Sequence, residues 1–239
     1  MWRRGGALAL CLVAAFFGAA AAAEGARDIT GASYSAPTTR YAHGVLGDDI
    51  EYGALELQFA DGSSRRFTLP ENLVFEDTAP RLADVTGDGF PEVITVESAL
   101  ALGARLTIWN SDGRLASTPH IGQSSRWLAP VGTADLDGDG SIEIAYIDRP
   151  HLARILRIWR FEGGQLTEVA QKSGLTNHQI GQDFITGGIR DCDGTTEIIT
   201  VNTDWSRIVA SRFDGTKISS REIGAFNGSS SVDRALACN

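Results

Sequence analysis

The chain has 239 residues, of which 43% are hydrophobic and 21% are charged, so it can form one large folded domain or two small ones. Aspartate and glutamate (30) outnumber lysine and arginine (21), which gives a formal net charge of −9. This acidity and the lack of a basic stripe exclude a nucleic-acid partner bound through its phosphates. Acidic residues gathered in turns favour divalent cations instead.

Residues 1–23 have the pattern of a Sec-type signal peptide. Arg3 and Arg4 form a short cationic region, residues 7–17 are apolar, and small residues lead to an expected cleavage site after Ala23. A lipoprotein signal at Cys11 is the alternative, but Leu10 stands where such a signal needs a small residue. No later apolar run is long enough to span a membrane. The mature chain is therefore expected to be secreted or periplasmic, without a membrane span.

Residues 24–40 are rich in serine, threonine, alanine and glycine, which predicts a flexible N-terminal segment. The folded domain is expected over residues 41–239, with a first strand at 41–46. No helical periodicity is present after the signal peptide, so no helix is expected.

Four hairpin turns divide this domain at intervals of 51 residues: Asp61-Gly62, Asp112-Gly113, Gly163-Gly164 and Asp214-Gly215. Strand-like segments flank each turn, and two-residue turns of this composition supply the positive φ that a tight hairpin needs. Four strands in about 51 residues is the size of one propeller blade. The sequence therefore predicts an all-β fold, a small β-propeller of about four blades, with approximate units 41–78, 79–129, 130–182 and 183–239.

An acidic loop recurs in phase with these turns, and its best-formed copy begins at residue 135. Carboxylates at alternate positions of a loop with glycine at its sixth position can converge on one cation. Calcium accepts six to eight oxygen ligands, and without an ion such carboxylates repel one another. The expected ligands are Asp135, Asp137, Asp139, the carbonyl of Ser141 and Glu143.

Two further copies of the loop are less complete. The first copy is expected to bind calcium more weakly, because threonine replaces one carboxylate; its candidate ligands are Asp84, Thr86, Asp88, Phe90 and Glu92. The last copy has Ile189 at its first position and keeps Asp191, Asp193 and Glu197, so its binding of calcium is left open. An EF-hand is excluded for the middle loop, since Tyr146 stands at its twelfth position and a strand-like segment follows.

This loop, followed by a hydrophobic strand and repeated at blade spacing, resembles the FG-GAP/VCBS repeat of integrin α-subunit propellers and of many bacterial exported proteins. The resemblance covers residues 41–223 and implies a propeller with calcium ions at the blade turns. The Phe-Gly and Gly-Ala-Pro motifs that name the family are not cleanly present. The resemblance does not define a ligand, because members of the family bind very different partners.

Cys192 and Cys238 are the two cysteines of the mature chain, and an even number in an exported protein predicts a disulfide. Catalytic motifs are scarce: the four histidines lack metal-ligand spacing, and there is neither a nucleophile elbow nor a phosphate-binding glycine loop. Trp109 and Trp159 stand at matched positions before their hairpins and are expected to pack between blades, with carbohydrate stacking as the alternative.

The sequence thus predicts an exported, calcium-binding β-propeller that acts as a non-catalytic binding or structural module. Its partner would be an unidentified protein or glycan, and a propeller this small could be one part of a larger assembly. The alternative is an extracellular carbohydrate-active enzyme with a propeller fold, because a fold by itself does not define function.

Overall fold

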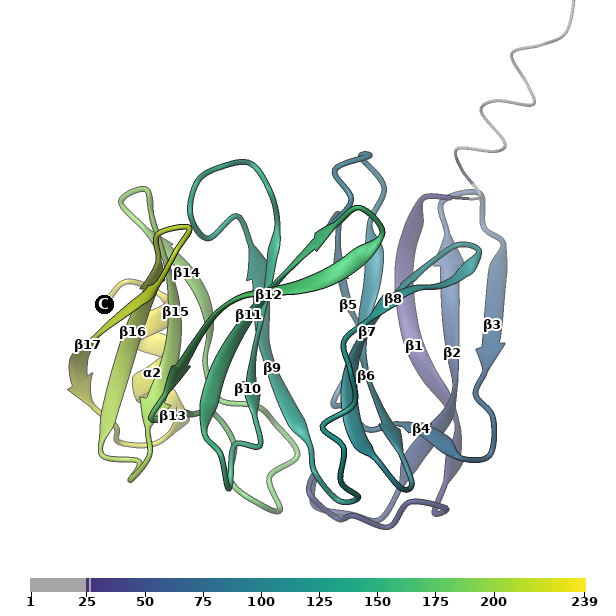
Figure 1. Ribbon diagram of the computed structural model, residues 1–239, viewed down its shortest axis with the longest axis horizontal. Helices are drawn as coiled ribbons and strands as arrows, with labels where there is room; N and C mark the ends of the chain where they lie inside the picture. The colour runs from purple at the N-terminus through teal and green to yellow at the C-terminus, as the bar shows by residue number, and fades with distance from the viewer. Residues whose placement is uncertain (1–24, 26) are drawn as a thin grey trace, which may run out of the picture.

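The structure, a computed structural model, describes Gly25 and residues 27–239 (Figure 1). It consists of antiparallel strands and, within the described elements, one short helix, α2 (Ser229–Leu236). The predicted all-β class is therefore confirmed. The expected signal peptide lies outside the described residues. Within the part of the chain that the structure covers, no helix has the length and apolar character needed to cross a membrane.

The first unit contains β1 (Ile29–Thr38), β2 (Glu51–Phe59) and β3 (Ser64–Thr68), with β2 in the centre. Strand β1 corrects the expectation of a flexible segment over residues 24–40, since pairing with β2 along almost its whole length orders it. Residues 41–46, expected as a strand, form turns and irregular backbone. Their conformation follows from packing, because Val45 is buried in the hydrophobic core formed by the second and third units.

The three units that follow share one plan of four antiparallel strands in chain order. The second unit has β5 (Arg81–Ala83), β6 (Glu92–Ala99), β7 (Gly103–Asn110) and β8 (Gly113–Ser117). The third has β9 (Leu128–Ala134), β10 (Glu143–Asp148), β11 (Ile155–Glu162) and β12 (Gln165–Ser173). The fourth has β14 (Gly188–Cys192), β15 (Thr195–Asn202), β16 (Arg207–Phe213) and β17 (Ile218–Ala225).

Two short strands extend the first strand of a unit beyond a break. β4 (Leu73–Phe75) pairs with β6 beside β5, and β13 (Leu175–Thr176) pairs with β15 beside β14. β4 also pairs with β2, so the first two units form one eight-stranded sheet. The four predicted hairpin turns are all present, at the β2–β3, β7–β8, β11–β12 and β16–β17 connections.

The units follow one another along the long axis of the molecule, and the first and fourth units lie at opposite ends (Figure 1). A hydrophobic cluster fills each junction between consecutive units. Within the described residues no strand of the first unit pairs with one of the fourth. The blade-like repeat is thus present, but closure of four blades into a ring is not seen.

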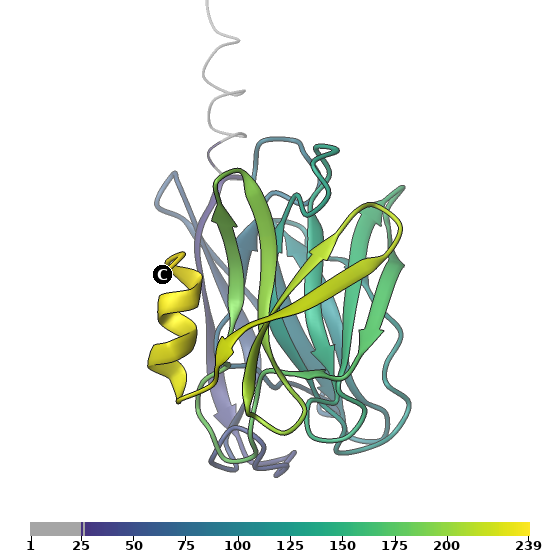
Figure 2. The same ribbon diagram turned by 90° about the vertical axis from the view of Figure 1, so that its left-hand side faces the viewer.

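The exposed ends of this row have different coverings. On the first unit, Glu56 and Gln58 alternate with the buried Leu55 and Leu57, which leaves a polar outer face. On the fourth unit, α2 packs against the sheet through Val232 and Ala235 (Figure 2). The helix was not expected from the sequence. Polar or covered end faces are what an open array of repeats needs to stay in solution.

The predicted disulfide is confirmed. Cys192 at the end of β14 is bonded to Cys238 just beyond α2, with a Cα–Cα distance of 5.9 Å. The bond ties the helix to the edge of the last sheet.

Candidate metal centre

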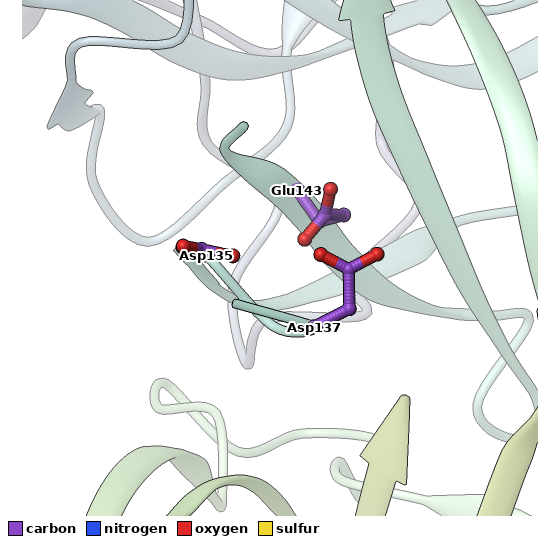
Figure 3. A group of neighbouring side chains, drawn as sticks. All are labelled: Asp135, Asp137 and Glu143. Carbon is purple, nitrogen blue, oxygen red and sulfur yellow. The ribbon is translucent and has the colours of Figure 1, made fainter. Parts of the chain in front are cut away.

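Three carboxylates gather at the loop that joins β9 to β10. One oxygen from each of Asp135, Asp137 and Glu143 lies within 4.8 Å of the other two. Figure 3 shows the carboxylates of Asp137 and Glu143 facing one another, with Asp135 beside them. Glu143 is fully buried as the first residue of β10, whereas the two aspartates are half-buried.

The loop folds around Asp135. Its Oδ1 accepts hydrogen bonds from the backbone N–H groups of Gly138 (2.7 Å) and Asp139 (3.1 Å), and its Oδ2 accepts one from Gly140 (2.9 Å). Gly138 and Gly140 have φ angles of 82° and 90°, a region that residues with a Cβ rarely adopt. The alternation of aspartate and glycine is therefore what allows the chain to turn tightly enough to bring the carboxylates together.

Glu143 closes the loop from the strand side. Its Oε2 accepts a hydrogen bond from the Leu136 N–H at 2.9 Å. Burial raises the pKa of this carboxyl, while the Leu136 N–H and the nearby Arg160 act in the opposite direction.

Arg160 provides a positive charge beside these carboxylates. It lies opposite Glu143 in the β10–β11 register and forms ion pairs with Glu143, with Asp137 (2.9 Å) and with Asp139 (2.9 Å). The carboxylates raise the pKa of its guanidinium above the already high usual value. A positive charge is thus stable at this position, which the guanidinium occupies in place of a metal cation.

The donor set fits a hard divalent cation. All the side-chain donors are carboxylate oxygens, which calcium and magnesium prefer, and neither histidine nor cysteine belongs to the group. Asp139, also predicted as a ligand, directs its carboxylate to Arg160 and to the Ser141 N–H (2.7 Å). Coordination by Asp139 and by the Ser141 carbonyl stays a prediction.

The loop between β5 and β6 repeats this construction. Asp84 accepts hydrogen bonds from the N–H groups of Gly87 (2.7 Å) and Gly89 (2.9 Å), and Glu92 accepts one from Val85 (3.0 Å). The Thr86 hydroxyl donates a hydrogen bond to Glu92 at 3.3 Å.

The carboxylate of Asp88, another predicted ligand of this first loop, points elsewhere, and coordination by Phe90, which has only its carbonyl to offer, stays a prediction. Asp88 is ion-paired with Arg27 at 2.7 Å, and the Phe90 ring lies under the same guanidinium. Within the described residues, only the middle loop brings three carboxylates within 4.8 Å of one another. The weaker binding of calcium expected for the first loop stays a prediction.

The comparison with known families covers both of these loops. The sequence model of the FG-GAP-like repeat family matches residues 84–146, which run from Asp84 in the first acidic loop through β6, β7, β8 and β9 and the middle acidic loop into β10. The chain carries an FG-GAP-like repeat. The resemblance predicted from the sequence is therefore confirmed over this segment. No curated protein matches the chain at a significant level.

The last acidic segment lies outside the matched FG-GAP-like region, and its geometry differs. Strands β14 and β15 pair up to Cys192 and Thr195, so only a two-residue turn, Asp193-Gly194, separates them. Glu197 is held by Arg190 (2.6 Å) and by Arg221, which lower the pKa of its carboxyl. Strand pairing and these two arginines leave this copy without the open loop that the two FG-GAP-like loops have.

The two tryptophans occupy equivalent positions in the second and third units. Trp109 is opposite Val93, and Trp159 is opposite Ile144. They are 5% and 8% exposed, so they pack within the junctions between units and offer little surface to a sugar ring. The residue after each tryptophan distinguishes the two loops: it is Asn110 beside the first and Arg160 beside the middle one. Arg160 could not be identified from the sequence, because it is 17 residues from Glu143 along the chain and only strand register joins them.

Proposed function

We propose that this protein is an exported, propeller-like binding or structural module whose FG-GAP-like loops bind calcium, and that it has no catalytic role. The observation that carries the calcium assignment is the convergence of Asp135, Asp137 and Glu143 in a glycine-bearing turn. Calcium would be held by these residues, with Asp139 and the Ser141 carbonyl completing the set, and it would supply a compact divalent charge that links the loop to β10.

Arg160 has a defined part in this proposal. Its guanidinium offsets part of the negative charge of the cluster when no ion is bound, which reduces the repulsion between neighbouring carboxylates. A divalent cation bound at these carboxylates would repel the guanidinium, and the two cations would compete for the same oxygens. Calcium binding therefore includes the cost of displacing Arg160, and the expected affinity lies in the range of extracellular calcium modules, with Kd about 10⁻⁴–10⁻³ M.

Export is proposed on two features. The Cys192–Cys238 disulfide suits an oxidising compartment, and residues 1–23 have the pattern of a signal peptide. Calcium at millimolar concentration in such a compartment would keep a weak site occupied.

The direct test of this function is thermal unfolding of the mature protein with calcium and with a chelator. A ligand that binds only the folded state stabilises it, by about 2.7 kcal/mol at a hundredfold excess over Kd. We expect Tm to rise with calcium concentration and the rise to be lost in Asp135→Asn. An equal Tm at every calcium concentration would contradict the proposal.

A further inference from the structure

A second candidate site lies on the opposite face of the molecule from the acidic loops. It is a cavity of about 240 Å³. Four connecting segments far apart in sequence form its wall, and they contribute His43, residues 125–127, residues 149–152 and Ile180. These segments connect strands at the lower edge of the view in Figure 1, whereas the acidic loops lie at its upper edge. Concave sites where several segments converge are the usual places for small ligands.

The inner wall of the cavity is held by a chain of ring contacts. The Trp127 indole, 2% exposed, donates its Nε1–H to the Glu76 carbonyl at 2.8 Å and packs edge-on against His178. His178 Nε2–H donates to the Gln182 carbonyl (2.9 Å), so its Nδ1 accepts from His151 Nε2–H (3.0 Å). The wall is therefore fixed before any ligand enters, which lowers the entropic cost of binding.

The charge of the lining is opposite to that of the protein. Among the described residues no acidic side chain lines the cavity, although the chain has a net charge of −9, whereas Arg126 and Arg149 do. Arg126 forms no ion pair with any described carboxylate; its Nη1 donates only to the Ser125 carbonyl (2.8 Å). Arg149 is paired with Asp148, and Arg157, which shares that carboxylate, is also paired with Glu168, so the charge in surplus is that of Arg126. Cationic groups in surplus at a concave site favour an anion.

His43, also in the lining, is oriented by a buried carboxyl group. Its Nδ1 lies 2.5 Å from Oε1 of the fully buried Glu76, whose other oxygen accepts a hydrogen bond from Ser98. The carboxylate thus lies behind the histidine, away from the cavity, and fixes the orientation of the ring.

The backbone at the cavity is strained at two lining residues. Ser125 has a φ of 54° and Arg149 a φ of 47°, in the left-handed region that residues with a Cβ rarely adopt. The Ser125 N–H donates to the Tyr41 hydroxyl (2.9 Å), and the Arg149 N–H donates to the Trp127 carbonyl (3.0 Å). These contacts hold both strained residues in place, and strain of this kind is concentrated at ligand sites.

The rim of the cavity is apolar. Leu152 and Ile180 are 62% and 72% exposed, the highest values among the large hydrophobic residues of the described chain. A ligand that contacts them and the arginines must be apolar at one end and anionic at the other.

We propose that this cavity binds a small organic carboxylate, with Arg126 and Arg149 contacting the carboxylate and Trp127, Leu152 and Ile180 contacting the apolar part. Arginine presents its donors in the planar geometry that a carboxylate accepts. The volume suits such a ligand, since a cavity of about 150 Å³ holds benzene. The site does not depend on the calcium loops.

The test uses three probes of similar shape and different charge: benzoate, benzyl alcohol and benzamidine. Binding to the mature protein is measured by titration calorimetry and by saturation-transfer NMR, in the presence of a chelator. We expect saturable binding of benzoate, binding of benzyl alcohol that is at least tenfold weaker, and no binding of benzamidine. Equal or tighter binding of benzamidine, or no saturable binding of benzoate, would overturn the proposal.

A pair of variants locates the site. Arg126→Gln should weaken benzoate at least fivefold and leave benzyl alcohol unchanged, because only the charged contact is removed. Arg66→Gln is the matched control: Arg66 is half-exposed on β3, lies outside the cavity and has one weak ion pair with Glu56. An equal effect of the two substitutions on benzoate binding would show that the anion binds elsewhere and would overturn the assignment.

Discussion

Arg160 and Glu143 lie opposite one another in the β10–β11 pair, and their ion pair places a guanidinium among the carboxylates of the middle acidic loop. The equivalent residue in the preceding unit is Asn110, which has no charge. Two loops with the same backbone construction therefore differ in whether the neighbouring strand places a cation against the buried glutamate; in the first loop, Arg27 pairs with Asp88 instead.

This difference predicts the effect of Arg160→Asn, which gives the middle loop the residue of the first. Without calcium the variant should have a lower Tm than the wild type, because the carboxylates lose their counter-charge. Calcium affinity should rise at least tenfold, equivalent to about 1.4 kcal/mol, because no guanidinium has to be displaced. Titration calorimetry measures the affinity.

The matched control for that experiment is Arg157→Asn on the same strand. Arg157 pairs with Asp148 and Glu168, away from the acidic loop, so its loss should lower Tm without changing calcium affinity. Weaker calcium binding in Arg160→Asn would show that the arginine supports the site and does not compete for it.

We expect the disulfide to make a large contribution to stability. Cys192 and Cys238 are 46 residues apart, and closing such a loop restricts the unfolded chain by about 4 kcal/mol in the chain-entropy model. The double variant Cys192→Ser/Cys238→Ser should lose about 2–4 kcal/mol of unfolding free energy in urea and become more sensitive to proteolysis near α2. Reduction of the wild type should reproduce the loss, and reduction of the variant should have no effect.

We expect alanine substitutions at Gly103 and Gly62 to differ in how much unfolding free energy they cost. Both have positive φ, 70° and 83°, so alanine is strained at either position. A Cβ at Gly103 would also collide with the Gln123 carbonyl and lie 2.7 Å from the Arg126 carbonyl, whereas at Gly62 it would meet open space. Gly62→Ala should cost about 1–2 kcal/mol, and Gly103→Ala should cost clearly more in the same urea titration. Equal losses would contradict the close approach.

We expect Glu51 to make the stability of the protein depend on pH. It is 2% exposed, and burial, together with the nearby Glu76, Asp48 and Asp77, raises its pKa to about 9. The folded state therefore binds a proton that the unfolded chain releases above its ordinary pKa of 4.5, so this contribution to stability falls as pH rises from about 4.5 to 9. In Glu51→Gln the unfolding free energy should decrease less steeply between pH 5 and 8. Parallel curves for variant and wild type would contradict the assignment.

The features that could be predicted from the sequence are those that a few neighbouring residues determine. Asp-Gly and Gly-Gly turns define hairpins by themselves, and the alternation of aspartate with glycine around Asp135 defines the acidic loop. Strand β1 was missed because its serines and alanines carry little signal and pairing with β2 orders it.

Helix α2 was missed for a related reason. It is short, and contacts through Val232 and Ala235 with the last sheet, together with the disulfide beyond it, hold it. The open row of units and the cationic cavity arise from packing between segments that are distant in sequence, which no local pattern reports.

The most direct test of the central claim is a calcium titration of the mature protein by calorimetry, beside Asp135→Asn. We predict saturable binding with Kd about 10⁻⁴–10⁻³ M, and the loss of one site in the variant with its fold retained by circular dichroism. A wild-type protein that takes up no calcium at millimolar concentrations, or a variant with unchanged stoichiometry and affinity, would contradict the assignment of Asp135, Asp137 and Glu143 as a calcium site.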